Sequence, residues 1–279
     1  MSCPDTARRY SLSFLTCLDA PPPEAIRTAA ETGYDAVGLR LLPASPGSIS
    51  FPLMHDPALM RDTLAALQDA GIAVFDVEII RITPNFSVAA HAGFFEACAR
   101  LGARSVLVAG DDADEGRTTA SFAALCEAAR PFGLSMDLEF MPQSAVHDAA
   151  AALRILKGAE QLNAAIIVDA LHVSRSRTSI ADIRAIPRAW MNYAQICDGP
   201  AEVPGDLDGL NFAARQARLL PGDGAIDLVT LFAGLPPDLP ISVEVPNQVQ
   251  APALGAREWA RRALLRSKAV MAQADACRA

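Results

Sequence analysis

The stretch Leu101-Gly102-Ala103-Arg104-Ser105-Val106-Leu107-Val108-Ala109 joins the end of a helical pattern to an apolar strand through one glycine. The same pattern recurs around Gly33, Gly71 and Gly133. Glycine suits this junction because helices often end in the left-handed backbone conformation, which glycine adopts without a Cβ clash. The repeat therefore predicts units in which a helix is followed by a buried strand.

Eight apolar segments fit this strand pattern and alternate with alanine-rich helical stretches. The expected strands are 11–17, 34–40, 72–78, 103–109, 134–139, 164–169, 192–197 and 240–245. The first and last starts enclose seven intervals of about 33 residues, a typical strand–helix spacing. An α/β chain of eight such units predicts a closed parallel (β/α)8 TIM barrel. A doubly wound sheet is the alternative, but no Gly-x-Gly-x-x-Gly motif follows the first strand.

Length and composition favour one large domain. We expect the 279 residues to form a single barrel domain over 1–279, with its core at about 10–272. The 51% hydrophobic content excludes a disordered chain. No uncharged apolar run approaches the ~20 residues of a membrane span. A net charge of −8 argues against a nucleic-acid partner.

The cysteines and the N-terminal region predict a cytoplasmic protein. Six cysteines are scattered without a Cys-x-x-Cys pair, which favours reduced thiols over disulfides or a zinc knuckle. The pair Arg8-Arg9 precedes an apolar stretch, as in some export signals. That stretch ends at Asp19 without a cleavage site, so we expect a first strand there instead.

Polar residues close four of the expected strands, at the barrel end where TIM barrels place their chemistry. Glu139, Asp169 and Glu244 end three of them, and Gln195 takes the corresponding place on the fourth. A carboxylate that ends a buried strand is costly unless a cation compensates it. Four oxygen ligands at one barrel mouth favour Mg²⁺ or Mn²⁺, with Co²⁺ or Zn²⁺ as alternatives. The sequence therefore predicts a metal site.

These strand ends carry a resemblance to a known family. The motifs are Glu139, Asp169-Ala170-Leu171-His172, Gln195-Ile196-Cys197-Asp198, the loop 220–227 and Glu244. In this order they resemble the sugar phosphate isomerase/epimerase family of xylose isomerase-like TIM barrels, over about residues 10–272. The resemblance implies that Glu139, Asp169, Gln195 and Glu244 are the metal ligands. Many members have histidine in place of Gln195, whereas glutamine is similar to the 3-dehydroshikimate and inosose dehydratases.

The expected activity is that of a divalent-metal-dependent isomerase or epimerase. Its substrate would be a sugar-like hydroxy-ketone that reacts through a metal-stabilised enediolate, with Glu139 and Glu244 as the acid/base pair. The alternative is a lyase, a metal-dependent dehydratase of a cyclic polyol ketone or acid such as 3-dehydroshikimate or an inosose. The residues leave this choice open.

Three further side chains are candidates for substrate contact. His172 could bind substrate hydroxyls or carry a proton, as a catalytic and a substrate-binding residue. Arg81 follows the third strand and resembles an arginine of the dehydroshikimate dehydratases; it could bind a carboxylate or phosphate, or form a surface salt bridge. Glu78 could pair with Arg81 or face the pocket. Arg218 lies in the long interval before the last strand, which we expect to form a lid or binding loop.

The expected partner is a small polyhydroxylated keto substrate, with neither nucleic acid nor a membrane. An abasic-site endonuclease on the same fold is excluded because the chain has four histidines and a charge of −8. A non-enzymatic binding subunit would not need such a set of carboxylates. We expect the stretch from Ala256 to Ala272 either to pack on the barrel or to form the interface of a homo-oligomer.

Overall fold

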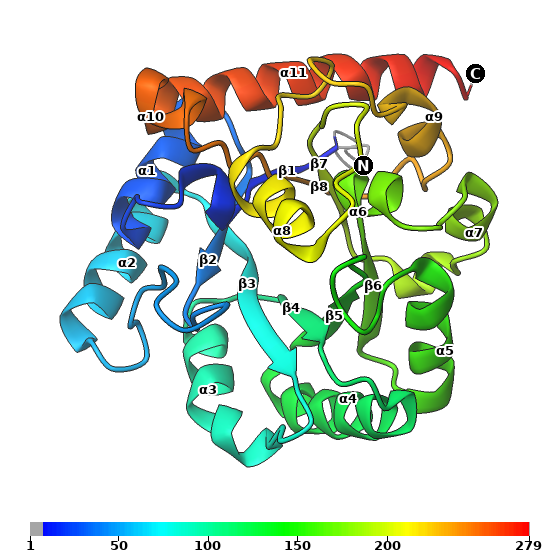
Figure 1. Cartoon of the computed structure of the whole chain (residues 1–279). Coiled ribbons are helices and arrows are strands. Elements are labelled where there is room, and N and C mark those ends of the chain that lie inside the picture. Colours follow the sequence, from blue (N-terminus) through cyan, green and yellow to red (C-terminus); the bar gives the residue numbers. More distant parts are fainter. Residues whose placement is uncertain (1–7, 279) are drawn as a thin grey trace, which may run out of the picture.

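The computed structural model describes residues 8–278, and they form a closed barrel of eight parallel strands with helices around it (Figure 1). The strands are β1 (Tyr10–Leu12), β2 (Ala36–Arg40), β3 (Ala73–Ile82), β4 (Ser105–Gly110), β5 (Ser135–Glu139), β6 (Ala164–Asp169), β7 (Ala194–Ile196) and β8 (Ile241–Val243). Each strand pairs with the next, and β8 closes on β1. The predicted TIM barrel is confirmed, and the doubly wound sheet is excluded.

The helices follow the predicted alternation. They are α1 (Pro22–Thr32), α2 (Pro57–Ala70), α3 (Ala92–Arg100), α4 (Glu115–Ala129), α5 (Ala149–Ala159), α6 (Ala170–Arg175), α7 (Ile180–Arg184), α8 (Leu207–Gln216), α9 (Leu228–Ala233), α10 (Gln250–Leu254) and α11 (Ala256–Ala276). The 3-10 helices are η1 (Phe14–Cys17), η2 (Val88–His91), η3 (Arg130–Phe132) and η4 (Arg188–Trp190). The glycines after α1 and α2 have left-handed φ angles of 87° and 65°, as the capping pattern requires.

The first strand is shorter than predicted. It ends at Leu12, and Phe14–Cys17 turn into η1 instead of continuing to Cys17. The turn is stabilised where the Thr16 hydroxyl donates to the carbonyl of Val243 and accepts from the backbone N–H of Val245. Residues 13–17 contain no glycine, proline or charged residue, so the sequence alone does not signal this turn.

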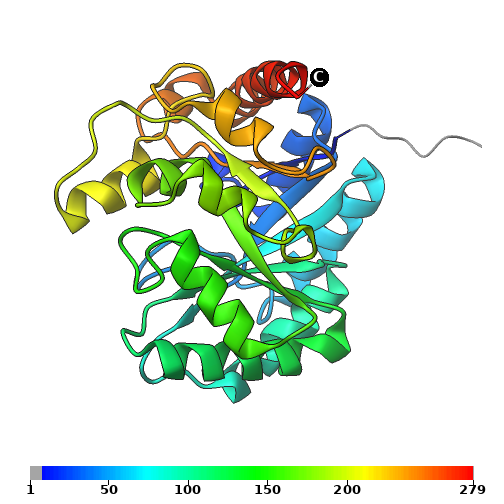
Figure 2. The ribbon, with the colours of Figure 1, turned by 90° about the vertical axis from the view of Figure 1, so that its right-hand side faces the viewer.

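Helix α11 packs on the barrel, which is one of the two arrangements expected for the C-terminal stretch. It lies along α1 and α9 at one side of the molecule (Figure 2). Trp259 is fully buried, and its indole N–H donates to the carbonyl of Val245 at 2.9 Å. This packing uses the apolar side of α11 inside one chain, and homo-oligomerisation stays a prediction.

Two findings bear on the expectations for membranes and thiols. Among the helices of residues 8–278, none combines the length and the apolar character needed to cross a bilayer. Cys17, Cys98, Cys126 and Cys197 are free and buried, and Cys277 is free and exposed. Cys3 lies outside the described residues. The cytoplasmic location itself stays a prediction.

Candidate metal and substrate site

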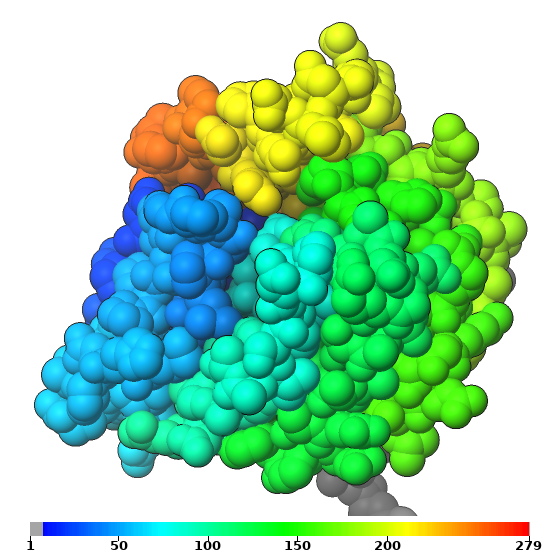
Figure 3. Space-filling view, turned by 60° about the horizontal axis from the view of Figure 1, so that its bottom comes forward, coloured from blue at the N-terminus to red at the C-terminus, as the bar shows by residue number. Residues whose placement is uncertain are grey.

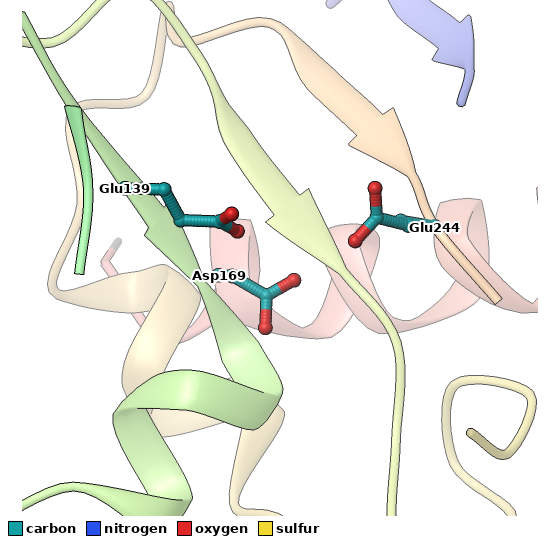
Figure 4. A group of neighbouring side chains, drawn as sticks. All are labelled: Glu139, Asp169 and Glu244. Carbon is teal, nitrogen blue, oxygen red and sulfur yellow. The ribbon is translucent and has the colours of Figure 1, made fainter. Parts of the chain in front are cut away.

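Three carboxylates meet at the mouth of the barrel. Glu139 ends β5, Asp169 ends β6, and Glu244 follows β8 directly. One oxygen from each lies within 4.8 Å of those of the other two, and all three residues are buried. Figure 4 shows the three side chains pointing toward one another from their separate strands. The expectation that these strand ends converge is therefore met by the geometry.

Gln195 on β7 lies beside these carboxylates. Its Nε2 donates to Glu244 Oε1 at 2.9 Å, and the residue is fully buried. Within residues 8–278, neither Gln195 Oε1 nor Glu139 Oε1 has a hydrogen-bond partner, although both atoms are buried. Buried oxygens without partners are costly. A cation bound between these oxygens would relieve that cost.

Arg218 is placed deeper than a residue on a lid would be. Its side chain is 2% exposed, with Nη1 2.6 Å from Asp169 Oδ2 and Nη2 2.9 Å from Glu244 Oε2. Its Nε donates to the carbonyl of Ala214 in α8. Arg218 therefore holds two of the three carboxylates, although it also lines the cavity above them.

The charges of the cluster leave room for a divalent cation. Glu139, Asp169 and Glu244 carry three negative charges when ionised, and Arg218 carries one positive charge, so the sum is −2. An all-oxygen site of this charge fits a hard divalent ion such as Mg²⁺ or Mn²⁺. The charge and the two unpartnered oxygens together meet the requirements of the expected metal.

The pKa directions reflect the crowding of carboxylates. Burial, followed by the charges of Glu244 and Asp169, holds the pKa of Glu139 well above its ordinary value. Burial likewise raises the pKa of Glu244 to about 7, against the opposing charge of Arg218. Burial also works to raise the pKa of Asp169, but the charge of Arg218, together with the hydrogen bonds from Arg218 and from the backbone N–H of His172, outweighs it and the pKa is lowered. Asp169 is thus the carboxylate that stays ionised most readily.

His172 lies beside this cluster as a neutral group. Its Nε2 is 3.8 Å from Glu139 Oε1, and its backbone N–H donates to Asp169 Oδ1, which caps α6. Burial lowers the pKa of His172 to about 4. At neutral pH the imidazole can therefore both donate and accept hydrogen bonds.

Arg40 and Arg81 each form an ion pair near the site, and the pairing partner of Glu78 differs from the one expected. Glu78 pairs with Arg40 at the end of β2, and Arg81 pairs with Asp111. Glu78 therefore does not pair with Arg81, because along the extended strand β3 these residues are three positions apart and point to different partners. Glu78 lines the cavity instead, which was the other expectation. Arg81 forms a salt bridge, which was the second expectation for this residue. It also lines the cavity.

Sequence reasoning missed Ser13 and Arg40. The Ser13 hydroxyl donates to Glu244 Oε1 at 2.8 Å, and the guanidinium of Arg40 stacks on the ring of Phe14. Arg40 ends a buried strand, so the rule applied to carboxylates would have found it. Nothing in the local sequence marks Ser13, because its contact depends on β1 pairing with β8.

A cavity of about 360 Å³ opens above the carboxylates. Its inner end is lined by Glu139, His172, Arg218 and Glu244. Its more exposed wall includes residues 44, 45 and 47–49, Arg81, and Arg215 and Gln216 at the end of α8. Figure 3 shows the surface hollowed where the blue, cyan and yellow segments meet. The size is in the range of small-molecule sites.

The fold and the site define a TIM barrel with a buried acidic cluster at the carboxyl ends of its strands. The model of the xylose isomerase-like TIM barrel family matches residues 26–268, and the chain belongs to this family. No curated protein matches the chain significantly.

Solved structures show the same fold at low identity. A xylose isomerase-like TIM barrel/4-hydroxyphenylpyruvate dioxygenase fusion protein has a TM-score of 0.78 and 20% identity over 92% of this chain, which spans 42% of that protein. An IolI protein with a bound zinc atom has a TM-score of 0.78 and 19% identity, covering 95% of this chain and 98% of that one. A D-allulose 3-epimerase from Methylomonas sp. has a TM-score of 0.68 and 18% identity, covering 95% and 99%. At these identities the likeness concerns the fold.

Proposed function

We propose that this protein is a divalent-metal-dependent isomerase or epimerase of a sugar-like hydroxy-ketone. The observation that carries the proposal is the buried set of Glu139, Asp169 and Glu244, with ligand oxygens within 4.8 Å of one another, of which Glu139 and Glu244 line the cavity. The similar D-allulose 3-epimerase and IolI folds support it. A small polyhydroxylated ketone is the proposed partner.

Glu139, Asp169, Gln195 and Glu244 would hold the cation, with Mg²⁺ or Mn²⁺ as the first choice. When bound, such an ion supplies stabilisation of the negative charge that develops on substrate oxygens next to the reacting carbon. Asp169 would remain ionised beside Arg218, and the carbonyl oxygen of Gln195 would gain the partner it lacks.

Glu244 and Glu139 are the proposed acid/base pair. Glu244 has a pKa of about 7, so near neutral pH it can take a proton from the carbon beside the substrate carbonyl. Glu139, with a pKa well above its ordinary value, can hold a proton and return it. Ser13 and Gln195 donate to the same Glu244 oxygen and would fix its orientation.

His172 and Arg218 are proposed to contact the substrate. The neutral imidazole of His172 faces Glu139 at 3.8 Å and could hydrogen-bond a substrate hydroxyl or relay its proton. Arg218 lines the cavity while it holds Asp169 and Glu244 in place. Its role toward the carboxylates is therefore that of a positioning residue as well.

Dehydration is the second candidate reaction. The fully buried Gln195, at a place where histidine is common in the resembled family, favours it. Its first step is the same removal of a proton beside a carbonyl. If a hydroxyl on the next carbon then leaves as water, the product is conjugated instead of epimerised. Glu139 would protonate that leaving hydroxyl.

Proton exchange in D₂O tests the shared first step. Ketohexoses and 3-dehydroshikimate are incubated with the Mn²⁺-loaded protein, and deuterium uptake is followed by NMR. We expect exchange that Glu139→Gln and Glu244→Gln each reduce at least about a hundredfold, as loss of an acid/base group does. Exchange without loss of water supports the isomerase, and an aromatic or conjugated product that has lost water supports the dehydratase.

Glu96→Gln is the matched control, because Glu96 is exposed on α3. It should exchange protons at the wild-type rate. Equal exchange by Glu139→Gln, Glu244→Gln and Glu96→Gln would exclude the proposed acid/base pair.

A further inference from the structure

Besides Arg218, three arginines line the cavity, and two of them have their charges matched. Arg40 pairs with Glu78, and Arg81 pairs with Asp111. The side chain of Arg81 is 23% exposed, and in the part of the chain that the structure describes its only hydrogen bond is made by Nη1, to Asp111, so that Nη2 has no partner. Arg81 therefore keeps donors available for a ligand in spite of its ion pair.

Arg215, the third arginine, has no matching charge. It lies in the last turn of α8 and is half-buried. Among residues 8–278, no carboxylate forms an ion pair with it and no acceptor bonds its side chain. Burial lowers the pKa of Arg215, and the positive charges of Arg81 and Arg40 lower it further, against the smaller opposing effect of Asp111, whose carboxylate is paired with Arg81. The outer cavity thus has one unmatched positive charge held close to two others.

An unmatched guanidinium that is partly buried among like charges is unfavourable in the absence of a ligand. Water at the open mouth solvates part of it, but an anion would match its charge directly. Arginine is also the side chain best suited to bind carboxylate or phosphate with two hydrogen bonds. The two ends of the cavity therefore differ in charge. The carboxylates at the inner end favour binding of a cation, and the arginines toward the opening favour binding of an anion.

We infer that Arg81 and Arg215 form a subsite for an acidic group of the substrate, a carboxylate or a phosphate. This inference rests on the proposed function, because it places the hydroxy-ketone end of the same molecule at Glu139 and Glu244. The substrate class is then an acidic hydroxy-ketone, and neutral ketoses are poor ligands. Arg215 belongs to α8, so the acidic group would also hold that helix over the mouth.

Three small α-hydroxy-ketones that differ in one substituent test the subsite. They are dihydroxyacetone, hydroxypyruvate and dihydroxyacetone phosphate, whose substituents are neutral, carboxylate and phosphate. Affinities are measured by calorimetry with the Mn²⁺-loaded full-length protein at low salt. At least one anion should bind about tenfold or more tightly than dihydroxyacetone, since a charge-assisted hydrogen bond is worth at least that factor. The stronger of the two anions identifies the acidic group.

Variants assign the preference to the two arginines. Arg215→Met and Arg81→Met should each reduce the affinity for the preferred anion about tenfold while leaving dihydroxyacetone binding within about twofold. Arg61→Met is the matched control, because Arg61 is exposed on α2 away from the cavity, and it should bind all three probes like the wild type. Circular dichroism verifies that the variants are folded.

The outcomes separate this inference from the proposed function. If the wild type binds the anions no better than dihydroxyacetone, or if both arginine variants keep the full preference, the subsite is refuted even where proton exchange is observed. If the preference and its loss in Arg215→Met are found but exchange is absent for every ketone, the subsite stands and the proposed reaction fails.

Discussion

Arg218 alone determines the net charge of the ionised carboxylate cluster. Burying three carboxylates together is unfavourable, and a guanidinium in contact with two of them offsets part of that cost. When all three carboxylates are ionised, as metal binding requires, the remaining charge of −2 follows from this single residue. Without Arg218 the cluster would carry −3, and a divalent ion would leave it unneutralised.

At the same scale, the titration of Glu244 predicts how stability depends on pH. Its pKa in the folded protein is about 7, above the ordinary value of 4.5. Between these values the folded state keeps a proton that the unfolded state has lost. The free energy of unfolding of the metal-free protein should therefore fall as pH rises from 4.5 to 7, by up to about 3 kcal/mol.

The comparison with Glu244→Gln isolates this contribution. His172, whose pKa of about 4 lies below its ordinary 6.5, contributes in the opposite direction, since stability gained from it increases as pH rises from 4 to 6.5. The variant keeps His172 and removes the titration of Glu244. Urea unfolding is measured with EDTA at several pH values. The free energy of unfolding of the variant minus that of the wild type should increase toward pH 7. Parallel pH profiles would contradict the assigned titration.

At the scale of elements, Asp198 organises the loop that follows β7. Its carboxylate accepts backbone N–H groups from Gly199, Gly222, Gly224 and Ile226, at distances of 2.8 to 3.1 Å. The loop also pairs with the chain beside Arg218, because Asp198 and Leu219 exchange two backbone hydrogen bonds of 2.9 Å. The position of Arg218 in the site therefore depends on this loop.

Gly224→Ala tests that dependence. A Cβ at Gly224 would lie 2.3 Å from Asp198 Oδ1 and 2.4 Å from the carbonyl oxygen of Gly199, so the loop has to shift. We expect a loss of about 2 kcal/mol or more in the free energy of unfolding. Gly205→Ala is the control, since nothing lies within 4 Å of its added Cβ, and it should change stability by less than about 0.5 kcal/mol. Equal stability of the two variants in urea unfolding would contradict the packing described for the loop.

For the whole molecule, binding of a divalent cation should stabilise the fold. An ion that binds only the folded protein adds about 2.7 kcal/mol at a hundredfold excess over Kd, which raises Tm by several degrees in a chain of this size. Differential scanning calorimetry of the EDTA-treated protein, with and without Mn²⁺, measures this shift.

Glu139→Gln provides the contrast and Glu96→Gln the control for this experiment. The first removes one of the three clustered carboxylates and should reduce the Tm shift, while the second should keep it. A wild-type Tm that is unchanged by millimolar Mn²⁺ would exclude the metal site.

The sequence by itself determined the barrel and the carboxylates at its mouth. The spacing of the repeats, the capping glycines and the apolar segments are local properties of the sequence. They specify eight strand–helix units because each unit buries its strand in the same way. The polar residues at the ends of four predicted strands identified the expected metal ligands, which are Glu139, Asp169, Gln195 and Glu244.

Only the tertiary structure decided which charges meet. Arg218 reaches Asp169 across 49 positions of the chain, Arg40 reaches Glu78 across 38, and Ser13 reaches Glu244 across 231. The unmatched charge of Arg215 likewise emerges only when α8 is placed over the mouth. Such pairings depend on the register of the closed barrel and the course of its loops, because electrostatic partners are chosen by distance in space and leave no local pattern in the sequence.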